Sequence, residues 1–410
     1  MVRYLNQDAT FEPTIEALCE GIKNSKYADI LNSSKFEPAM KEIKEGVKES
    51  VKKIIEFLVQ DVYPKYVNLK DNLDSLYCMG TTQLATFIGV YFNIFILENS
   101  DHSKALVKFL LVCSSHRNKK ISAKTFDFWT AWRQNIVSED VIDYVKNGDF
   151  NYIVESYLDL YKIVIEKCKL NSLKIVSIQE ARKTKIYNVD TDQEEDYDED
   201  YTIIDLKKQN FSIREYRHTA EDVLYDCLIT LSTLQGQEGT AALFSLILPI
   251  LAPEYPTNNN INLSDPNARA DYLLNCEVVI FSVKFMLDNC NDNEPHPFIL
   301  EMIKNMILLP REDILTRGIL NFLAEASGQV KFIPEYSDKL FEFCLKDIMN
   351  PNLLGAASKC FQDFSETIGD RISFGTLEQI AQIMDSIIYN IEVIFWVVKI
   401  SPFPLGYRIE

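Results

Sequence analysis

The sequence predicts an all-α protein, an alpha-alpha superhelix in which HEAT-like antiparallel helix pairs form a single solenoid over residues 1–410. Three observations support this fold class. Helix-start signals recur at a regular spacing, and apolar residues repeat with the period of one helix face. The chain also holds only 13 Gly and 14 Pro, which disfavours an all-β fold with many tight turns. Because one compact core rarely exceeds about 300 residues, a chain of 410 residues requires two domains or a repeat architecture.

Apolar runs in the first 250 residues predict a series of helices, although their repeat period is harder to read. Two segments interrupt this series, an acidic segment at 186–210 and a Pro- and Asn-containing segment at 252–267. Both are typical of loops inserted between helices. The expected helices cover residues 12–24, 38–60, 80–98, 101–113, 121–135, 139–146, 149–170, 211–233 and 239–251.

The helix starts between residues 268 and 390 follow a regular pattern. First helices are expected to begin at 268, 310 and 351, which are 42 and 41 residues apart and match the ~40 to 47 residues of a HEAT unit. Second helices are expected near 294, 334 and 374. The start signals are Asn267, Pro295, Pro310, Pro334, the pair Asn350 and Pro351, and Gly375. The segment 389–410 diverges from the pattern.

Apolar residues in this region fall on one face of each expected helix. The first such set is Leu315, Ile319, Phe322, Leu323 and Ala326. A later set includes Phe361, so we expect Phe361→Ala to destabilise the fold by about 3 to 5 kcal/mol.

Common catalytic and metal-site patterns are absent from the sequence. The four histidines, His102, His116, His218 and His296, lie far apart, with neither an HExxH motif nor metal-ligand spacing. We expect each of them at a surface or an interface. Nor is there a Gly-rich phosphate loop or a GxSxG motif. We therefore expect no enzymatic activity and no cofactor.

The formal charge of -18 restricts the partners of the chain. An acidic protein repels phosphate backbones and anionic membranes, so nucleic acid is excluded as a direct partner, whereas a basic protein fits. Solubility is the alternative explanation. Three apolar stretches, at 84–97, 241–252 and 387–400, are too short to span a membrane. The nine cysteines contain no CxxC pair, which is typical of buried, reduced thiols in the cytosol or nucleus.

The acidic run inside 186–210 is a candidate contact for a basic partner surface. A solvated loop held open by like-charge repulsion is the alternative. An EF-hand calcium loop is disfavoured because its sixth and twelfth positions hold Glu195 and Tyr201. The run comprises Asp190, Asp192, Glu194, Glu195, Asp196, Asp198, Glu199 and Asp200.

Two further clusters stand close together in the sequence. The basic patch 116–120 precedes a helix and is either a solvated turn or a ligand site. Phe126, Phe128, Trp129 and Trp132 follow at helical spacing, which favours core packing.

Several collinear stretches carry a resemblance to a known family. The stretch 110–116 precedes a Phe-x-Phe-Trp motif at 126–129, and the acidic run precedes an Arg- and Asp-bearing helix. The match continues at 277–286, 308–310 and 356–360, and covers about residues 76–388. These stretches resemble the central repeats of transportin-SR type nuclear import receptors, members of the importin-β (karyopherin) superfamily. The residues that carry the resemblance are Phe126, Phe128, Trp129, Phe211, Arg214, Arg217, Asp222 and Asp226.

This resemblance implies import of proteins through nuclear pores under the control of the small GTPase Ran. It further implies basic or arginine-serine-rich cargo, contacts with nuclear pore proteins, and a location in cytoplasm and nucleus. The family's main Ran-binding repeats precede the matched region and its arginine-rich cargo helix follows it, so we expect a fragment or a shortened product. Ran binding is assigned to no residue. The alternative function is a HEAT-repeat scaffold that assembles a complex outside nuclear transport.

Overall fold

The computed structural model describes residues 39–72, 75–92, 100–147, 151–169, 213–287, 293–383 and 385. Within these ranges the regular structure consists of helices joined by turns, with no strand, so the predicted all-α class is confirmed. The expected helix at 12–24, the acidic segment 186–210 and the segment 389–410 lie outside the described residues. The chain divides into two compact units, Met1–Ile250 with Glu254–Met286, and Leu251–Pro253 with Leu287–Glu410.

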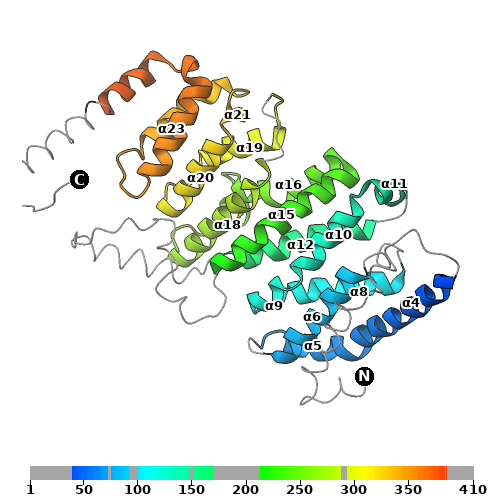
Figure 1. Cartoon of the computed structure of the whole chain (residues 1–410). Helices are drawn as coiled ribbons and strands as arrows, with labels where there is room; N and C mark the ends of the chain where they lie inside the picture. The colour runs from blue at the N-terminus through cyan, green and yellow to red at the C-terminus, as the bar shows by residue number, and fades with distance from the viewer. Residues whose placement is uncertain are drawn as a thin grey trace, which may run out of the picture. The chain divides into compact units, whose positions relative to one another are not determined.

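The first unit contains most of the helices (Figure 1). A single π-helical turn, Leu58–Val62, joins α4 to α5. Pro64 has no N–H to donate within this helix, which accounts for the change of hydrogen-bond register there. The α-helices are α4 (Ala39–Phe57), α5 (Tyr63–Leu69), α6 (Leu76–Tyr91), α8 (Asp101–Ser114), α9 (Lys119–Ala123), α10 (Phe126–Ile136), α11 (Glu139–Asn147), α12 (Asn151–Cys168), α15 (Ile213–Gln235), α16 (Gln237–Leu251), α17 (Tyr255–Asn258) and α18 (Pro266–Lys284).

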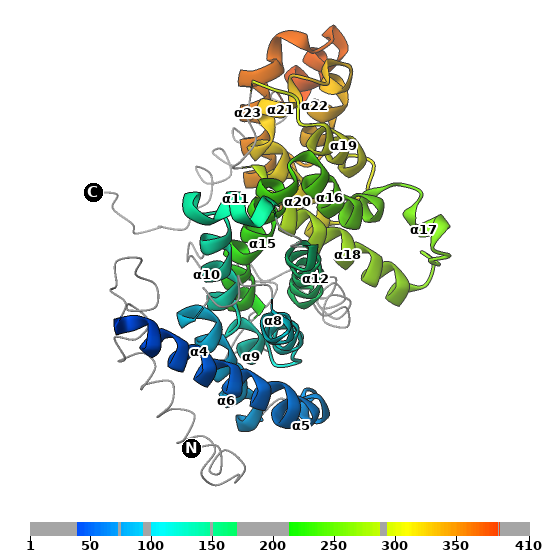
Figure 2. The same cartoon turned by 90° about the vertical axis from the view of Figure 1, so that its right-hand side faces the viewer.

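The helices of the first unit form two layers. On one side α6 contacts α10 and α10 contacts α15, and on the other α8 contacts α12 and α12 contacts α18 (Figure 2). Contacts of α6 with α8, and of α12 with α15, join the layers. This is the packing expected for stacked helix pairs, each of which covers an apolar face of the next.

Side-chain caps set several helix starts in the first unit. Ser75 accepts a hydrogen bond from the Cys78 N–H (3.1 Å), so α6 begins earlier than the predicted residue 80. The helix predicted at 121–135 is two helices, because Asn118 caps α9 and the chain turns before α10. The cap of α18 is Asp265, followed by Pro266 at the first helical position, and not the predicted Asn267. The segment predicted as a loop at 252–267 also contains the one-turn helix α17.

The described part of the second unit contains five labelled α-helices, two 3₁₀ turns and a last helical stretch. It comprises α19 (Pro297–Met306), α20 (Asp313–Glu325), α21 (Ser327–Val330), a 3₁₀ turn at Pro334–Tyr336, α22 (Ser337–Leu345), α23 (Leu354–Ile368) and a second 3₁₀ turn at Gly369–Arg371, after which residues 374–383 are helical. α23 packs against α20, α21 and α22, and α19 contacts α21.

The helix starts predicted at prolines in this region were early by two or three residues, whereas the start predicted near 374 is confirmed. Pro295, Pro310 and Pro351 lie in the connections before α19, α20 and α23, and Pro334 opens a 3₁₀ turn before α22. Asn350 does not cap a helix: its side-chain oxygen accepts from the Asn352 N–H (3.0 Å) in the turn before α23, and its side-chain amide donates to Asp313 (3.2 Å). First helices now begin at 266, 313 and 354, so a spacing of 41 residues is retained between the last two.

The core of the second unit contains the predicted apolar face of α20. Leu315, Ile319, Phe322, Leu323 and Ala326 are all buried. On α23, however, the fully buried aromatic residue is Phe364, whereas Phe361 is half-buried against Phe341. The predicted core position of Phe361 is therefore wrong, and we expect the large loss of stability for Phe364→Ala instead.

Polar contacts in the second unit recur at a separation of about one helix pair. The Arg311 guanidinium donates to the Phe343 carbonyl (3.0 Å), and the Asn352 amide donates to the Asp313 carboxylate (3.0 Å). Asp338 accepts hydrogen bonds from the Ser373 N–H and the Thr376 hydroxyl, both at 2.8 Å. Separations of 32 to 39 residues are typical of neighbouring repeats that touch at equivalent positions. A single superhelix over residues 1–410 stays a prediction.

Candidate functional site

The aromatic residues that carry the family resemblance lie in the core of the first unit. Phe128 and Trp129 are fully buried and Phe126 nearly so. The Trp129 indole N–H donates to the Ser114 hydroxyl (3.0 Å), and the Phe128 ring lies directly against Gly89 of α6. The core-packing interpretation of this cluster is therefore confirmed, and these rings form no surface contact site.

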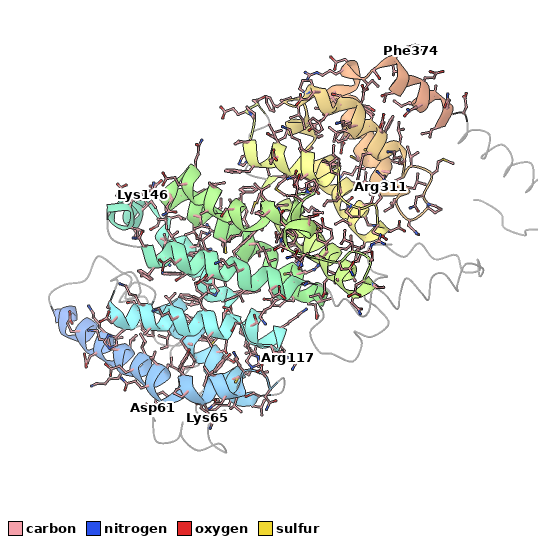
Figure 3. All side chains as sticks on the ribbon, turned by 180° about the vertical axis from the view of Figure 1, so that it is seen from behind. Asp61, Lys65, Arg117, Lys146, Arg311 and Phe374 are labelled. Carbon is pink, nitrogen blue, oxygen red and sulfur yellow. The ribbon has the colours of Figure 1, made fainter. Side chains whose placement is uncertain are left out.

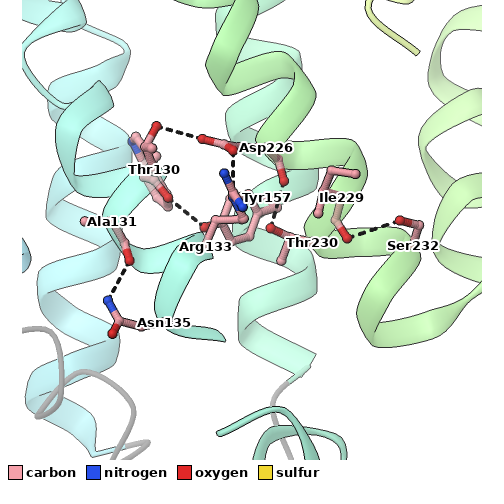
Figure 4. A network of polar contacts seen from close by, with 10 residues as sticks. Thr130, Ala131, Arg133, Asn135, Tyr157, Asp226, Ile229, Thr230 and Ser232 are labelled. Carbon is pink, nitrogen blue, oxygen red and sulfur yellow. Dashed lines mark hydrogen bonds and ion pairs between the residues drawn. The ribbon is translucent and has the colours of Figure 1, made fainter. Parts of the chain in front are cut away.

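Asp226 anchors a polar network that joins α10 to α15 (Figure 4). Its carboxylate accepts hydrogen bonds from the Thr130 hydroxyl and from the Arg133 guanidinium, both at 2.7 Å. Burial raises the pKa of Asp226, although both hydrogen bonds and the positive charge of Arg133 oppose that shift. The Tyr157 hydroxyl of α12 donates to the Trp129 carbonyl (3.0 Å), so three helices meet here. All these groups have partners, which indicates a structural role.

Arg217 forms a second buried connection, between α15 and α18. Its guanidinium donates to both carboxylate oxygens of Glu277, at 2.8 and 2.6 Å, and lies over the Phe281 ring. The Arg217 Nε–H also donates to the Cys168 carbonyl at the end of α12 (2.8 Å). This arrangement fixes the start of α15 against the end of α12.

The other predicted site residues do not join this junction. Asp222, one turn before Asp226, is exposed on α15. Arg214 lies in the first turn of α15, but its side chain is outside the described residues. Phe211 and all eight acidic residues of the run 190–200 also lie outside them. The proposed contact of this run with a basic partner stays a prediction.

A cluster of positive charge at the same junction was not predicted as a unit. We define the Lys119–Lys167 cluster as these two lysines together with Arg217. Lys167, at the end of α12, donates to the His116 carbonyl, and the Lys119 ammonium lies 5.8 Å from the centre of the Tyr216 ring. The patch 116–120 was visible in the sequence, but nothing there indicated that Lys167, 51 residues from His116, lies beside it.

His116 lies inside the protein, and not at a surface or an interface as predicted. Its side chain is fully buried, and its Nδ1 accepts a hydrogen bond from the Asn118 N–H (3.0 Å). Its Nε2 has no partner among the described residues. Burial, and then the charge of Lys167, lower the pKa of His116 to about 4, so the ring is neutral at physiological pH.

The described residues contain no group of three or more His, Cys, Asp or Glu side chains that could hold a metal ion. The seven cysteines among them are free and buried, as predicted for Cys78, Cys113, Cys168, Cys227, Cys276, Cys344 and Cys360. Two of these, Cys344 on α22 and Cys360 on α23, have their sulfur atoms 3.2 Å apart. In the part of the chain that the structure describes, no helix combines the length and apolar character needed to cross a bilayer.

Comparison with known proteins adds no relative: no protein-family model matches the chain, and no curated protein does so. Among the described residues that carry the resemblance to importin-β type receptors, Asp222 is exposed, whereas the others with described side chains are packing or pairing residues, namely Phe126, Phe128, Trp129, Arg217 and Asp226. Such residues determine a fold more than a function.

Proposed function

We propose that this chain is a protein-binding helical-repeat receptor of the importin-β type. It would carry basic or arginine-serine-rich proteins between cytoplasm and nucleus, under the control of Ran and through contacts with nuclear pore proteins. The observation that carries the proposal is the recurrence of inter-helix contacts at one-repeat separations in the second unit, together with the two helical layers of the first. Repeat stacks of this kind expose long surfaces that suit extended protein partners.

The distribution of charge supports a basic cargo. The acidic run is inserted in the sequence between α12 and α15, and it supplies eight of the 60 acidic residues of the chain. Closely spaced carboxylates of one sign steer a positively charged partner toward them and bind it more weakly as salt rises.

A direct test uses the whole chain and a fluorescent peptide of arginine-serine repeats. We expect saturable binding that weakens with salt. Replacing all eight acidic residues of the run by Ser should lower the affinity by about tenfold or more. A matched variant with eight exposed acidic residues replaced elsewhere has the same net charge and should bind as the wild type does. Equal affinity in all three proteins would contradict a cargo contact at the run.

Addition of Ran separates the two candidate functions. For a transport receptor we expect GTP-loaded Ran to change the affinity for the peptide, and GDP-loaded Ran to change it much less. A scaffold that assembles a complex outside nuclear transport predicts equal binding with either nucleotide. Equal binding would therefore contradict Ran control of cargo binding by this chain and favour the scaffold.

A further inference from the structure

The ends of α12 and α15 meet the turn before α9, and three basic side chains lie at that meeting point. Lys167 of α12 donates to the His116 carbonyl in this turn. Arg217 of α15 donates to the Cys168 carbonyl (2.8 Å), and Lys119 lies over the Tyr216 ring. Residues from three helices therefore position the ammonium groups of the Lys119–Lys167 cluster.

Charge is left uncompensated in this cluster. The guanidinium of Arg217 is neutralised by its paired contacts with Glu277. Among the described residues, no carboxylate lies within ion-pair distance of Lys119 or Lys167. Two positive charges thus remain unpaired in a chain whose formal charge is -18.

Burial makes these two charges costly for the free protein. Both side chains are half-buried, and desolvation lowers the pKa of each to about 8. The positive charge of Arg217 also lowers the pKa of Lys119. The positive charge of Lys119 in turn lowers the pKa of Lys167. An anion that enters such a site recovers the electrostatic energy that the free protein lacks, which makes the site selective for negative charge.

The kind of anion follows from the donors. A bidentate phosphoryl clamp uses a free guanidinium fork, but that of Arg217 is already occupied by Glu277. Two lysine ammonium groups are separate point charges on flexible stems, and they can pair with successive carboxylates of an extended peptide. Arg117 of this turn is exposed (Figure 3), as is Lys120 of α9, and both extend the positive charge to the surface.

We propose that the Lys119–Lys167 cluster binds an acidic segment of a partner protein, with its carboxylates paired to the two ammonium groups. The cluster contains no residue of the acidic run and has the opposite charge, so it selects a different partner from the basic cargo proposed above. It does not depend on that proposal.

The test is an equilibrium titration of the full chain with a fluorescein-labelled peptide of alternating Glu and Asp. We expect saturable binding to the wild type and a loss of about tenfold or more in Lys119→Gln/Lys167→Gln. The matched control is Lys339→Gln/Lys359→Gln, which removes two exposed lysines, one of which also lies over a tyrosine ring. This control should bind within about twofold of the wild type. Similar binding by both double variants would overturn the proposal.

Further measurements control for misfolding of the double variant and for competition by the acidic run of the chain itself. Lys119→Arg/Lys167→Arg retains both charges and should retain binding. In the wild type, the peptide should protect Lys119 and Lys167 from amine acetylation, read by mass spectrometry, and unchanged labelling of both would contradict the site. Replacing the acidic run by Ser removes carboxylates of the chain itself that could compete with the peptide. If neither this variant nor the wild type binds the peptide, the proposed site is excluded.

Inorganic phosphate distinguishes the source of the anion. Phosphate at millimolar concentration should displace the peptide no better than chloride at equal ionic strength. Displacement by phosphate alone would assign the cluster to phosphoryl groups and overturn the choice of an acidic peptide.

Discussion

The polar contacts within the first unit differ from those within the second unit in sequence separation and in burial. In the first unit, Arg133 and Asp226 pair across 93 residues, and the Asp226 side chain is only 2% exposed. In the second unit, Asp338 bonds to Ser373 and Thr376 across 35 and 38 residues, from a position near the surface. A buried long-range contact is costly to break, whereas contacts between neighbouring repeats can open locally. The comparison predicts global effects of substitutions in one unit and local effects in the other.

The largest effect should come from the core of the second unit, where burial outweighs the surface polar contacts. Phe364→Ala should lower the free energy of unfolding by about 3 to 5 kcal/mol, since the ring is fully buried. Phe361→Ala should cost about 1 to 2 kcal/mol, because the ring buries less area. Urea unfolding followed by circular dichroism measures both. Equal losses would contradict the assignment of the α23 core face.

The buried ion pair of the first unit should come next. Asp226→Ala leaves Arg133 and Thr130 without their acceptor and should cost about 3 kcal/mol. In the second unit, Asp338→Ala should cost about 1 kcal/mol, because water replaces its partners. Asp222→Ala, one turn away on α15 and exposed, is the control and should change stability by less than about 0.5 kcal/mol. If Asp226→Ala lowers the free energy of unfolding no more than Asp338→Ala does, the predicted difference between the two units is wrong.

A glycine in each unit sharpens the comparison of helix packing. A Cβ at Gly89 would lie 2.3 Å from the Phe128 ring, so Gly89→Ala should destabilise the first unit by about 1 to 3 kcal/mol. Gly355, in α23 of the second unit, has no atom within 4 Å of the same position. Gly355→Ala should therefore stabilise by up to about 1 kcal/mol through helix propensity. Thermal melts should move in opposite directions, and a parallel shift would be inconsistent with close contact of α6 and α10.

The smallest effect concerns pH and the first unit alone. The pKa of His116 is about 4 in the folded chain, below its ordinary value of 6.5, so the unfolded chain binds more protons between these values. Its contribution to stability is complete above pH 6.5 and falls as pH decreases toward 4. His116→Gln should lose less stability than the wild type between pH 7 and pH 5.5, by about 1 kcal/mol. The measurement is the free energy of unfolding in urea as a function of pH. Parallel profiles for His116→Gln and the wild type would contradict the burial of a neutral His116 ring.

The positions of the helices could largely be predicted from local signals. The predicted helix at 101–113 is α8, Asp101–Ser114, because its apolar period and the Ser100 cap are both local. Helix starts near proline were less accurate, since Pro310 and Pro351 lie in the connections three residues before α20 and α23.

The candidate site could be predicted only in part, because its partners are distant in sequence. Core packing of Trp129 follows from its spacing to Phe126 and Trp132. The pairing of Arg217 with Glu277 spans 60 residues, and no local pattern identifies such a partner. Lys119 and Lys167 come together only because the end of α12 reaches the turn before α9.

Hydrogen exchange of the full chain, read by mass spectrometry, tests the difference between the units most directly. For Asp226→Ala we expect faster exchange throughout α10, α12 and α15 together, because the network joins all three helices. For Asp338→Ala we expect faster exchange only in α22 and residues 373–383, with α12 and α15 unchanged. A uniform increase over both units in either variant, or no change at α10 in Asp226→Ala, would contradict the contrast between a buried long-range network and contacts between neighbouring repeats.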